Sequence, residues 1–280
     1  MKNPEAKGAL PKYGKPPVVE TIVGIQFDVL PEFRNGHLGA FWKSLSTVDW
    51  PNVGDAPTSQ PQFERFGTIS ADGANPCAGM PPAGSACTHI KNKEADRLIQ
   101  IQNGMLKFHW LGQTGGAYPR YETVRDWFVW AYMQFDAFVR SETLGDLRPN
   151  QWEVTYLNHI PKGTVWNTPT DWKFFQPMAS MPSVAAVIDG ESFGGTWHFA
   201  IPVEKGRLHV DWRHTRAAGS PPNDLVALTL TARGPLDPEK PDLTTILDGL
   251  NLGHETIVRS FERLMTPEAN KFWELDVGKE

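Results

Sequence analysis

The chain has 280 residues, 21% of them charged, and a formal net charge of -5 at pH 7. Because nucleic-acid affinity depends on neutralised phosphates, an acidic chain without a dense run of Lys or Arg disfavours general nucleic-acid binding. The N-terminal residues lack the apolar core of a signal peptide, and no stretch approaches the roughly 18 apolar residues of a membrane-spanning helix. We therefore expect a cytoplasmic protein with no membrane partner.

The first elements predicted along the chain are a strand and a short helix. Residues 18–30 alternate as a strand does, and the positions on its apolar face are Val19, Thr21, Val23, Ile25 and Phe27. Residues 37–46 predict a short helix with its apolar residues on one side. Residues 63–69 then predict a second strand.

Residues 70–96 predict a long loop, because Gly, Pro, Asn and Ala dominate and periodicity is absent. Such a loop is either a functional lid or a plain insertion, and the sequence does not decide between them. The only cysteines, Cys77 and Cys87, lie here and could, with His89, bind a metal or form a disulfide. Their spacing does not match a recognisable metal site, so we expect reduced thiols in a surface loop.

A β-hairpin followed by a long helix is the strongest fold signal in the sequence. Residues 98–102 and 105–111 are extended, and Asn103-Gly104 between them is a two-residue turn typical of hairpins. From Pro119 to about residue 140, apolar residues recur at helical steps and trace one face. Trp130 and Met133 lie off this face, so we expect the helix to be buried between layers rather than in an oligomer interface.

The rest of the chain predicts further strands, a connector and two helices. The strands are expected at residues 151–160, 185–192, 195–203, 207–215 and 224–232, and the connector at residues 161–182. Residues 243–265 carry apolar residues at helical steps. Thr266-Pro267-Glu268 then supplies the cap and first turn of a short last helix.

These elements predict an α+β fold with two strand-meander halves, each followed by a long helix. The N-terminal half covers residues 16–160 and the C-terminal half covers residues 183–276, with the connector between them. We expect the halves either to share one curved antiparallel sheet or to pack as separate lobes. No sequence repeat indicates a duplication.

Five segments, in their order and separation, resemble a family of sporadically distributed bacterial proteins of about this length. They are PPVVETIVGIQFDVL, RLIQIQNGMLKFHW, YPRYETV, WEVTYLNHIP and SFERLMTPEANKFW, and they span nearly all of residues 16–273. The family has no established activity, so the resemblance implies no catalytic residue. Its patchy distribution implies genes that travel with mobile elements, such as toxin-antitoxin and anti-phage modules.

The candidates for catalytic groups lie on the strand predicted at residues 207–215. His209, Asp211 and Arg213 alternate there and project from one face, and a hairpin turn brings His198 of the preceding strand beside them. A His next to a carboxylate can be a general base or part of a metal site, but an exposed sheet face has the same pattern and is the interpretation we favour. A nucleophile and a third metal ligand are missing, so we expect no metal site.

The candidates for ligand binding are Tyr118, Arg120 and His159. Tyr118 and Arg120 form an aromatic and cationic cluster at the start of the long helix, where free N–H groups could receive an anion. His159 ends a strand, a place where binding residues collect. A local turn explains Tyr118 and Arg120 better than an anion site does, and a plain strand end also explains His159. Lys107 and His109 share a face of the hairpin that we expect to be solvated.

The sequence favours a non-enzymatic accessory protein that binds a protein partner, as the antitoxin, immunity or adaptor component of a bacterial stress or anti-phage defence module does. Phosphate-loop, nucleophile-elbow and zinc-protease motifs are absent, no cofactor is expected, and 11 Trp residues suit an interface. The alternative is a small-molecule-binding protein or hydrolase, with a pocket between sheet and long helix near His198, His209 and Asp211. Enzymatic activity and homo-oligomer formation are left open.

Overall fold

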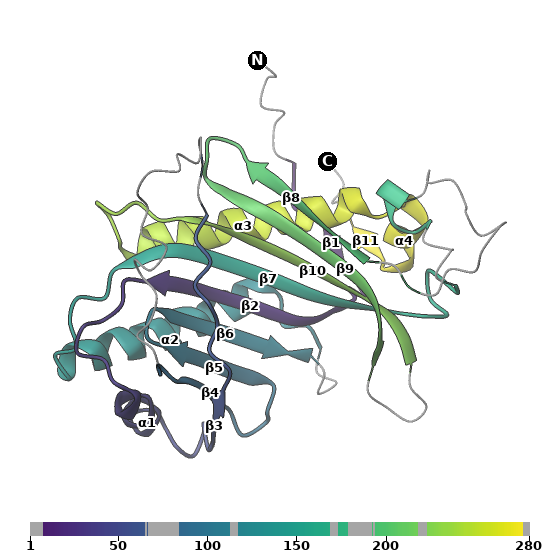
Figure 1. The fold of residues 1–280 in the computed structure, drawn as a ribbon. Helices are drawn as coiled ribbons and strands as arrows, with labels where there is room; N and C mark the ends of the chain where they lie inside the picture. Colours follow the sequence, from purple (N-terminus) through teal and green to yellow (C-terminus); the bar gives the residue numbers. More distant parts are fainter. Residues whose placement is uncertain are drawn as a thin grey trace.

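One antiparallel sheet organises the computed structural model, which describes residues 8–64, 66, 84–112, 117–168, 173–178, 192, 194–217 and 223–276. Its strands are β2 (Val18–Phe27), β3 (Asn52–Ala56), β4 (Cys87–Lys91), β5 (Arg97–Gln102), β6 (Met105–Leu111), β7 (Pro149–Pro161), β8 (Gly194–Ile201), β9 (Gly206–Ala217) and β10 (Asn223–Pro235). They lie in the order β3-β4-β5-β6-β2-β7-β10-β9-β8 (Figure 1). The predicted α+β class is confirmed, and of the two arrangements left open the shared antiparallel sheet is the one observed.

Two long helices cover one face of this sheet (Figure 1). The helices are α1 (Asn35–Ser44), α2 (Tyr121–Ser141), α3 (Leu243–Leu264) and α4 (Pro267–Phe272), with a short 3-10 turn at Gln176–Met178. Helix α2 packs on β2 and β6, and α3 packs on β7 and β10. A two-stranded sheet of β1 (Lys12–Tyr13) and β11 (Leu275–Asp276) lies apart from the large one. Within the described ranges, no helix combines the length and apolar character needed to cross a membrane.

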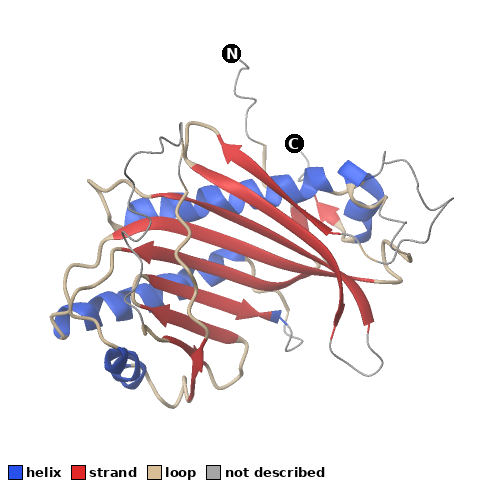
Figure 2. Ribbon diagram, viewed as in Figure 1, coloured by secondary structure: helices blue, strands red, loops and turns tan. Residues whose placement is uncertain are grey.

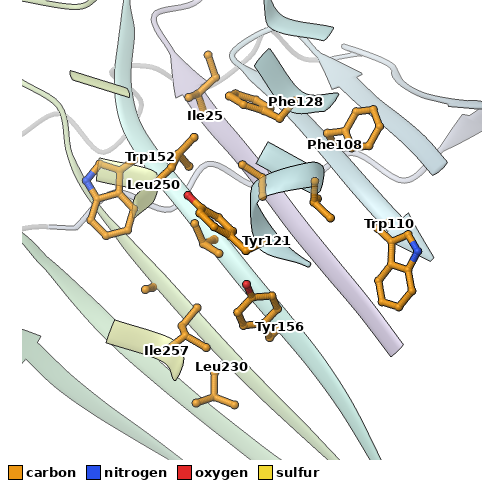
Figure 3. Close-up of a cluster of buried hydrophobic side chains, with 14 of the residues drawn as sticks. Ile25, Phe108, Trp110, Tyr121, Phe128, Trp152, Tyr156, Leu230, Leu250 and Ile257 are labelled. Atoms are coloured by element: carbon orange, nitrogen blue, oxygen red, sulfur yellow. The ribbon is translucent and has the colours of Figure 1, made fainter. Parts of the chain in front are cut away.

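The core lies between the sheet and the two long helices (Figure 3). Val23, Ile25 and Phe27 of β2 are buried there, as their shared strand parity predicts. The buried residues of α2 are Tyr121, Val124, Phe128, Ala131, Tyr132, Phe135, Phe138 and Val139. Each large apolar side chain that is fully buried contributes roughly 1.5–3 kcal/mol, so this layer supplies most of the stability of the fold.

Helix α3 approaches the sheet closely because two of its glycines face Trp152 of β7. A Cβ at Gly249 would lie 2.3 Å from Cδ1 of Trp152, and a Cβ at Gly253 would lie 2.7 Å from Cζ3. The helix begins with Asp242, whose side chain accepts a hydrogen bond from the amide of Thr245 at 2.8 Å. A local cap therefore fixes where α3 begins, and the two glycines allow the helix to pack close to the sheet.

The structure corrects the prediction for the region before the hairpin. Residues 63, 64 and 66, which are the described part of the strand predicted at 63–69, form no strand. The short strands β3, at the edge of the sheet, and β4 beside it lack a clear alternation, and the sequence does not predict them. Because β4 occupies the end of the predicted loop 70–96, Cys87 is a buried strand residue and not a surface thiol.

Other predictions for the loops have different outcomes. Helix α3 ends just before Thr266 and the short helix α4 begins just after it, as predicted. The hydroxyl of Thr266 caps α4 by accepting a hydrogen bond from the amide of Ala269 at 3.4 Å. Cys77 lies outside the described residues, as do residues 185–191 of a predicted strand, and residue 192 is not in a strand. Trp130 and Met133 are 38% and 56% exposed, so the prediction that this side of the helix is internally buried is wrong. Trp50 stacks on the ring of Trp130, and the rest of that side is exposed.

Residues 57–64 form an extended segment that crosses the sheet on the face opposite the long helices (Figure 2). We call this segment the strap. The amide of Ser59 donates to Oε1 of Gln102 at 2.9 Å, and Nε2 of Gln102 donates back to the Ser59 carbonyl at 2.7 Å. Gln26 and the backbone of Gln62 exchange the same two hydrogen bonds at 3.0 and 2.9 Å. Side-chain amides thus satisfy the strap backbone as a neighbouring strand would.

Candidate functional site

A cavity of about 480 Å³ lies on the helix side of the sheet. Its walls come from the start of α2, from α3, from β7 and from the segment that leads into β2. Tyr121, Tyr156, Leu230 and Ile257 line it and belong to the buried cluster in Figure 3. Small-molecule sites have volumes of roughly 300–1,000 Å³ and mostly apolar walls, and this cavity has both properties.

Three polar side chains form a hydrogen-bond chain along this cavity. The hydroxyl of Tyr118 donates to the hydroxyl of Tyr156 at 3.2 Å, and the hydroxyl of Tyr156 lies 2.8 Å from Nδ1 of His254. A hydroxyl can accept and donate at the same time, so Tyr156 links the other two groups, and the tautomer of His254 decides which of Tyr156 and His254 donates. The three groups come from the α2 entrance, β7 and α3, so only the folded chain brings them together.

His254 is held neutral in this site. Burial lowers the pKa of His254 to about 4, and the nearby carboxylates of Glu122 and Glu255 offset only part of that effect. Its ring stacks on the ring of Tyr121, with centroids 3.9 Å apart and planes 6° from parallel. At pH 7 the imidazole therefore carries one N–H and one acceptor nitrogen, and its Nδ1 shares a hydrogen bond with the Tyr156 hydroxyl.

The tyrosine hydroxyls around the cavity keep their protons. Burial raises the pKa of Tyr156 well above its ordinary value and also raises the pKa values of Tyr118 and Tyr121. The hydrogen-bond chain thus presents neutral groups to a largely apolar part of the wall, while Lys12, Arg120 and Glu122 also line the cavity. The neutral groups can orient a ligand without bringing a charge into the site.

Arg120 lies at the edge of the cavity, directly before α2. Its backbone has φ of +72°, a conformation that costs free energy in a residue other than glycine. Its Nη1 donates to the carbonyl of Tyr13 at 3.0 Å, and the hydroxyl of Tyr13 donates to Oδ1 of Asn270 at 2.7 Å. The arginine therefore ties the N-terminal segment, which forms one wall, to the start of α2.

Two of the three predicted ligand-binding residues, Tyr118 and Arg120, line this cavity, and His159 does not. Strand alternation explains the difference, because β7 turns Asn158 toward the helices and His159 toward the other face. Asn158 is 4% exposed and lines the cavity. The sequence does not single out His254 either, because this residue falls within the apolar stripe of α3. Its polar ring is the only sign that it differs from its neighbours in that stripe.

The predicted catalytic residues lie on the opposite face of the sheet. His198 and His209 are paired directly across β8 and β9, with ring centroids 4.6 Å apart. The hydroxyl of Thr196 donates to Asp211 at 2.6 Å, and both Asp211 and Arg213 are exposed. The alternation along β9 that groups these residues also keeps them out of the cavity on the helix side.

His209 contacts a carboxylate that the sequence does not predict to lie beside it. Nε2 of His209 and Nε of Arg233 each lie 2.6 Å from Oε1 of Glu64 in the strap, and Arg207 binds the other oxygen. The Glu64 side chain is 3% exposed. Burial alone would raise the pKa of Glu64, but the hydrogen bonds from Arg233 and His209 outweigh burial and lower it. Glu64 is therefore ionised at neutral pH and anchors the strap.

Lys107 and His109 are covered on the same face. Nζ of Lys107 lies 2.5 Å from Oε1 of Glu153, and the two side chains are 15% and 10% exposed. His109 is 8% exposed, and its Nδ1 lies 2.7 Å from Oε1 of Glu20. The prediction of a solvated strand face is wrong here, because carboxylates of β2 and β7 pair with these side chains.

Neither a group of metal ligands among the described residues nor a known relative identifies the site. In the described part of the chain, no three His, Cys, Asp or Glu side chains gather into a group that could hold a metal ion. Comparisons with protein-family models, with curated proteins and with solved structures find no match. The resemblance to a bacterial family stays a prediction.

Proposed function

We propose that this protein binds a small molecule with an apolar body and a hydrogen-bonding group in the cavity on the helix side of the sheet. The observation that carries the proposal is the chain Tyr118, Tyr156 and His254 set into a largely apolar cavity of about 480 Å³. Apolar walls supply binding free energy, roughly 25 cal/mol per Å² of apolar surface buried, and the polar chain orients the ligand. This is the alternative function expected from the sequence, at a different place on the sheet.

Binding fits the lining better than covalent catalysis does. The described residues that line the cavity include no Ser, Thr or Cys that could act as a nucleophile. The tyrosine hydroxyls are protonated and His254 is neutral at pH 7, so the hydrogen-bond chain itself supplies no activated base or acid. A retained ligand is the expected property.

Native mass spectrometry of the purified protein, followed by identification of retained small molecules, tests the proposal. The dissociation constant of the retained compound is then measured for the wild type and for Tyr156→Phe. Removing this hydroxyl breaks the chain between Tyr118 and His254 and leaves their hydrogen-bonding groups unpaired. We expect affinity to fall about tenfold, since an unpaired buried polar group costs roughly 1–3 kcal/mol.

Tyr132→Phe is the matched control, because Tyr132 is a buried tyrosine of α2 that does not line the cavity. It should leave the dissociation constant unchanged. A protein that retains no compound and gains no thermal stability from a library of apolar alcohols, phenols and acids would contradict the proposal. Equal losses of affinity in Tyr156→Phe and Tyr132→Phe would contradict the assigned role of the hydrogen-bond chain.

We retain protein binding, the function that the sequence favours, as a second proposal supported by α2. This helix exposes Trp130 and Met133, and the ring of Trp130 stacks on Trp50 with centroids 5.5 Å apart. Large rigid aromatic side chains are typical of interface hot spots. Affinity purification of the tagged protein from its own cells should retain a stoichiometric partner, such as a component of a defence module. The double substitution Trp130→Ala and Met133→Ala should release it, while Val48→Ala, 77% exposed elsewhere, should not.

A further inference from the structure

The cavity on the helix side of the sheet contains a buried acceptor that the hydrogen-bond chain does not use. This acceptor is Oδ1 of Asn158, a residue of β7 that lines the cavity and is 4% exposed. We infer that Asn158 selects ligands whose polar group is a neutral hydrogen-bond donor, namely apolar alcohols and phenols. The inference rests on the proposed function and names the class of ligand that the same cavity takes.

The position of Asn158 follows from strand alternation. Asn158 and Tyr156 are two residues apart on β7, so their side chains point to the same face of the sheet. In register, Asn158 lies between Val18 of β2 and Leu228 of β10. Val18 and Leu230 line the cavity with it. The amide is therefore a polar group set among apolar side chains.

The hydrogen bonds of Asn158 fix which way its amide points. Nδ2 donates to the carbonyl of Leu228 at 3.1 Å and lies 3.5 Å from the carbonyl of Tyr156. Because a carbonyl oxygen only accepts hydrogen bonds, these contacts identify the nitrogen of the amide and assign Oδ1 to the other side. Oδ1 has no partner among the described residues, yet it is not closed off from solvent. It therefore faces the cavity.

An unpaired acceptor at this depth sets a condition on any ligand. Water that enters the cavity can donate to Oδ1, and a ligand that displaces this water must replace its hydrogen bond. An amide oxygen only accepts, so the replacement has to be an O–H or an N–H group. A ligand that brings hydrocarbon or an ether oxygen to this place leaves Oδ1 unpaired and loses affinity.

Charged ligands satisfy this condition less well. A carboxylate has no proton to donate, and its charge would meet the oxygen of Asn158. The cations that line the cavity, Lys12 and Arg120, are exposed, so they lie where the cavity opens to solvent. An ammonium group could donate, but Glu122, the one carboxylate among the described lining residues, is exposed as well. Burying an unpaired charge costs more than burying a hydroxyl group, which leaves alcohols and phenols as the matching class.

Matched compounds that differ only in the polar group test the inference on the full-length protein. The probes are 2-naphthol and 4-cyclohexylphenol, their methyl ethers, and 2-naphthoate, each measured by equilibrium dialysis. We expect the phenols to bind at least about tenfold more tightly than the ethers and the carboxylate, because only a phenol donates to Oδ1. Asn158→Leu keeps the branched shape of the side chain and removes the acceptor, so the preference for phenol over ether should disappear.

The ratio of the ether and phenol dissociation constants separates ligand contact from a structural role. A purely structural Asn158 would change both constants alike, because loss of the hydrogen bond to Leu228 disturbs the cavity for either compound. Asn150→Leu is the control, since Asn150 lies in the same strand and does not line the cavity. It should leave the ratio unchanged. Asn158→Ala carries the same test if Asn158→Leu does not fold.

Failure of this inference differs from failure of the proposed function. If phenols and ethers bind equally, or if 2-naphthoate binds most tightly, the cavity binds ligands but Asn158 does not select them, and the inference is overturned. It is equally overturned if a folded Asn158 variant, with a native circular dichroism spectrum, keeps the preference for phenols. If no compound of any class binds, the proposed function fails and the inference fails with it.

Discussion

Trp152 and Gly249 touch where α3 crosses β7, and a Cβ at position 249 would fall 2.3 Å from Cδ1 of the indole. Carbon atoms do not approach one another so closely, so the helix reaches this depth only because the residue has no side chain. Both contacting atoms belong to rigid groups, the backbone of a long helix and a buried indole that is 2% exposed. Neither can move aside cheaply.

Gly249→Ala should therefore lower the free energy of unfolding by roughly 1–3 kcal/mol, because overpacking outweighs a gain in helix propensity of up to about 1 kcal/mol. Urea denaturation followed by tryptophan fluorescence measures the change. Gly39→Ala in α1 is the control, since a Cβ there has no atom within 4 Å and should stabilise the protein. A stabilised Gly249→Ala variant would show that α3 does not depend on this close contact.

His254 should make stability depend on pH. Its pKa falls from 6.5 to about 4 on folding, so between these values the unfolded chain binds more protons than the native one. The contribution of neutral His254 to the free energy of unfolding should be fully present above pH 6.5. It should be lost as the pH drops toward 4, which lowers the stability by up to roughly 3 kcal/mol. His254→Gln should have a shallower dependence in urea denaturation at pH 7 and 5. An unchanged slope would show that His254 does not carry the effect.

Glu64→Gln should loosen the strap. The substitution removes the charge that Arg207, His209 and Arg233 share, and breaking a buried ion pair costs about 3 kcal/mol. We expect lower stability and faster hydrogen exchange in residues 57–64. Glu274→Gln is the control, because its carboxylate is 51% exposed and the change should cost less than about 1 kcal/mol. Unaltered exchange in the Glu64 variant would mean that the glutamine contacts alone hold the strap.

Cys87 should be unreactive in the folded protein. It is 1% exposed in β4, and burial raises the pKa of its thiol, which lowers the thiolate fraction. In a Cys77→Ser variant, labelling with a disulfide reagent at pH 7.5 should proceed only as fast as the protein opens, and urea should accelerate it. Rapid stoichiometric labelling without denaturant would contradict the burial of this strand.

Periodicity in the sequence predicts the elements that pack by their own side chains. The hairpin at residues 98–111 and the helix α3 appear where alternation and helical spacing place them. The strap does not appear in this way, because Gln26 and Gln102 bind its backbone and not its side chains. Backbone contacts and single side-chain contacts such as those of Glu64 leave no periodic pattern in the sequence.

The site is less predictable than the fold because its groups come from distant parts of the chain. Alternation predicts which residues share a face with His209, but not that Glu64, 145 residues away, covers that face. Tyr118 is identified by its position before a helix, whereas His254 resembles an ordinary member of an apolar stripe. Local patterns identify faces, and only the assembled sheet identifies which faces meet.

The position of β2 also bears on how the protein is synthesised. This strand emerges first of the large sheet, yet it lies between β6 and β7, and β6 begins only at residue 105. At about 5–20 residues per second, a ribosome takes roughly 4–16 s to deliver that first neighbour. Throughout that interval an apolar strand leaves the ribosome with both edges unpaired, a template for aggregation. The yield of folded protein should therefore depend on chaperones that shield nascent chains.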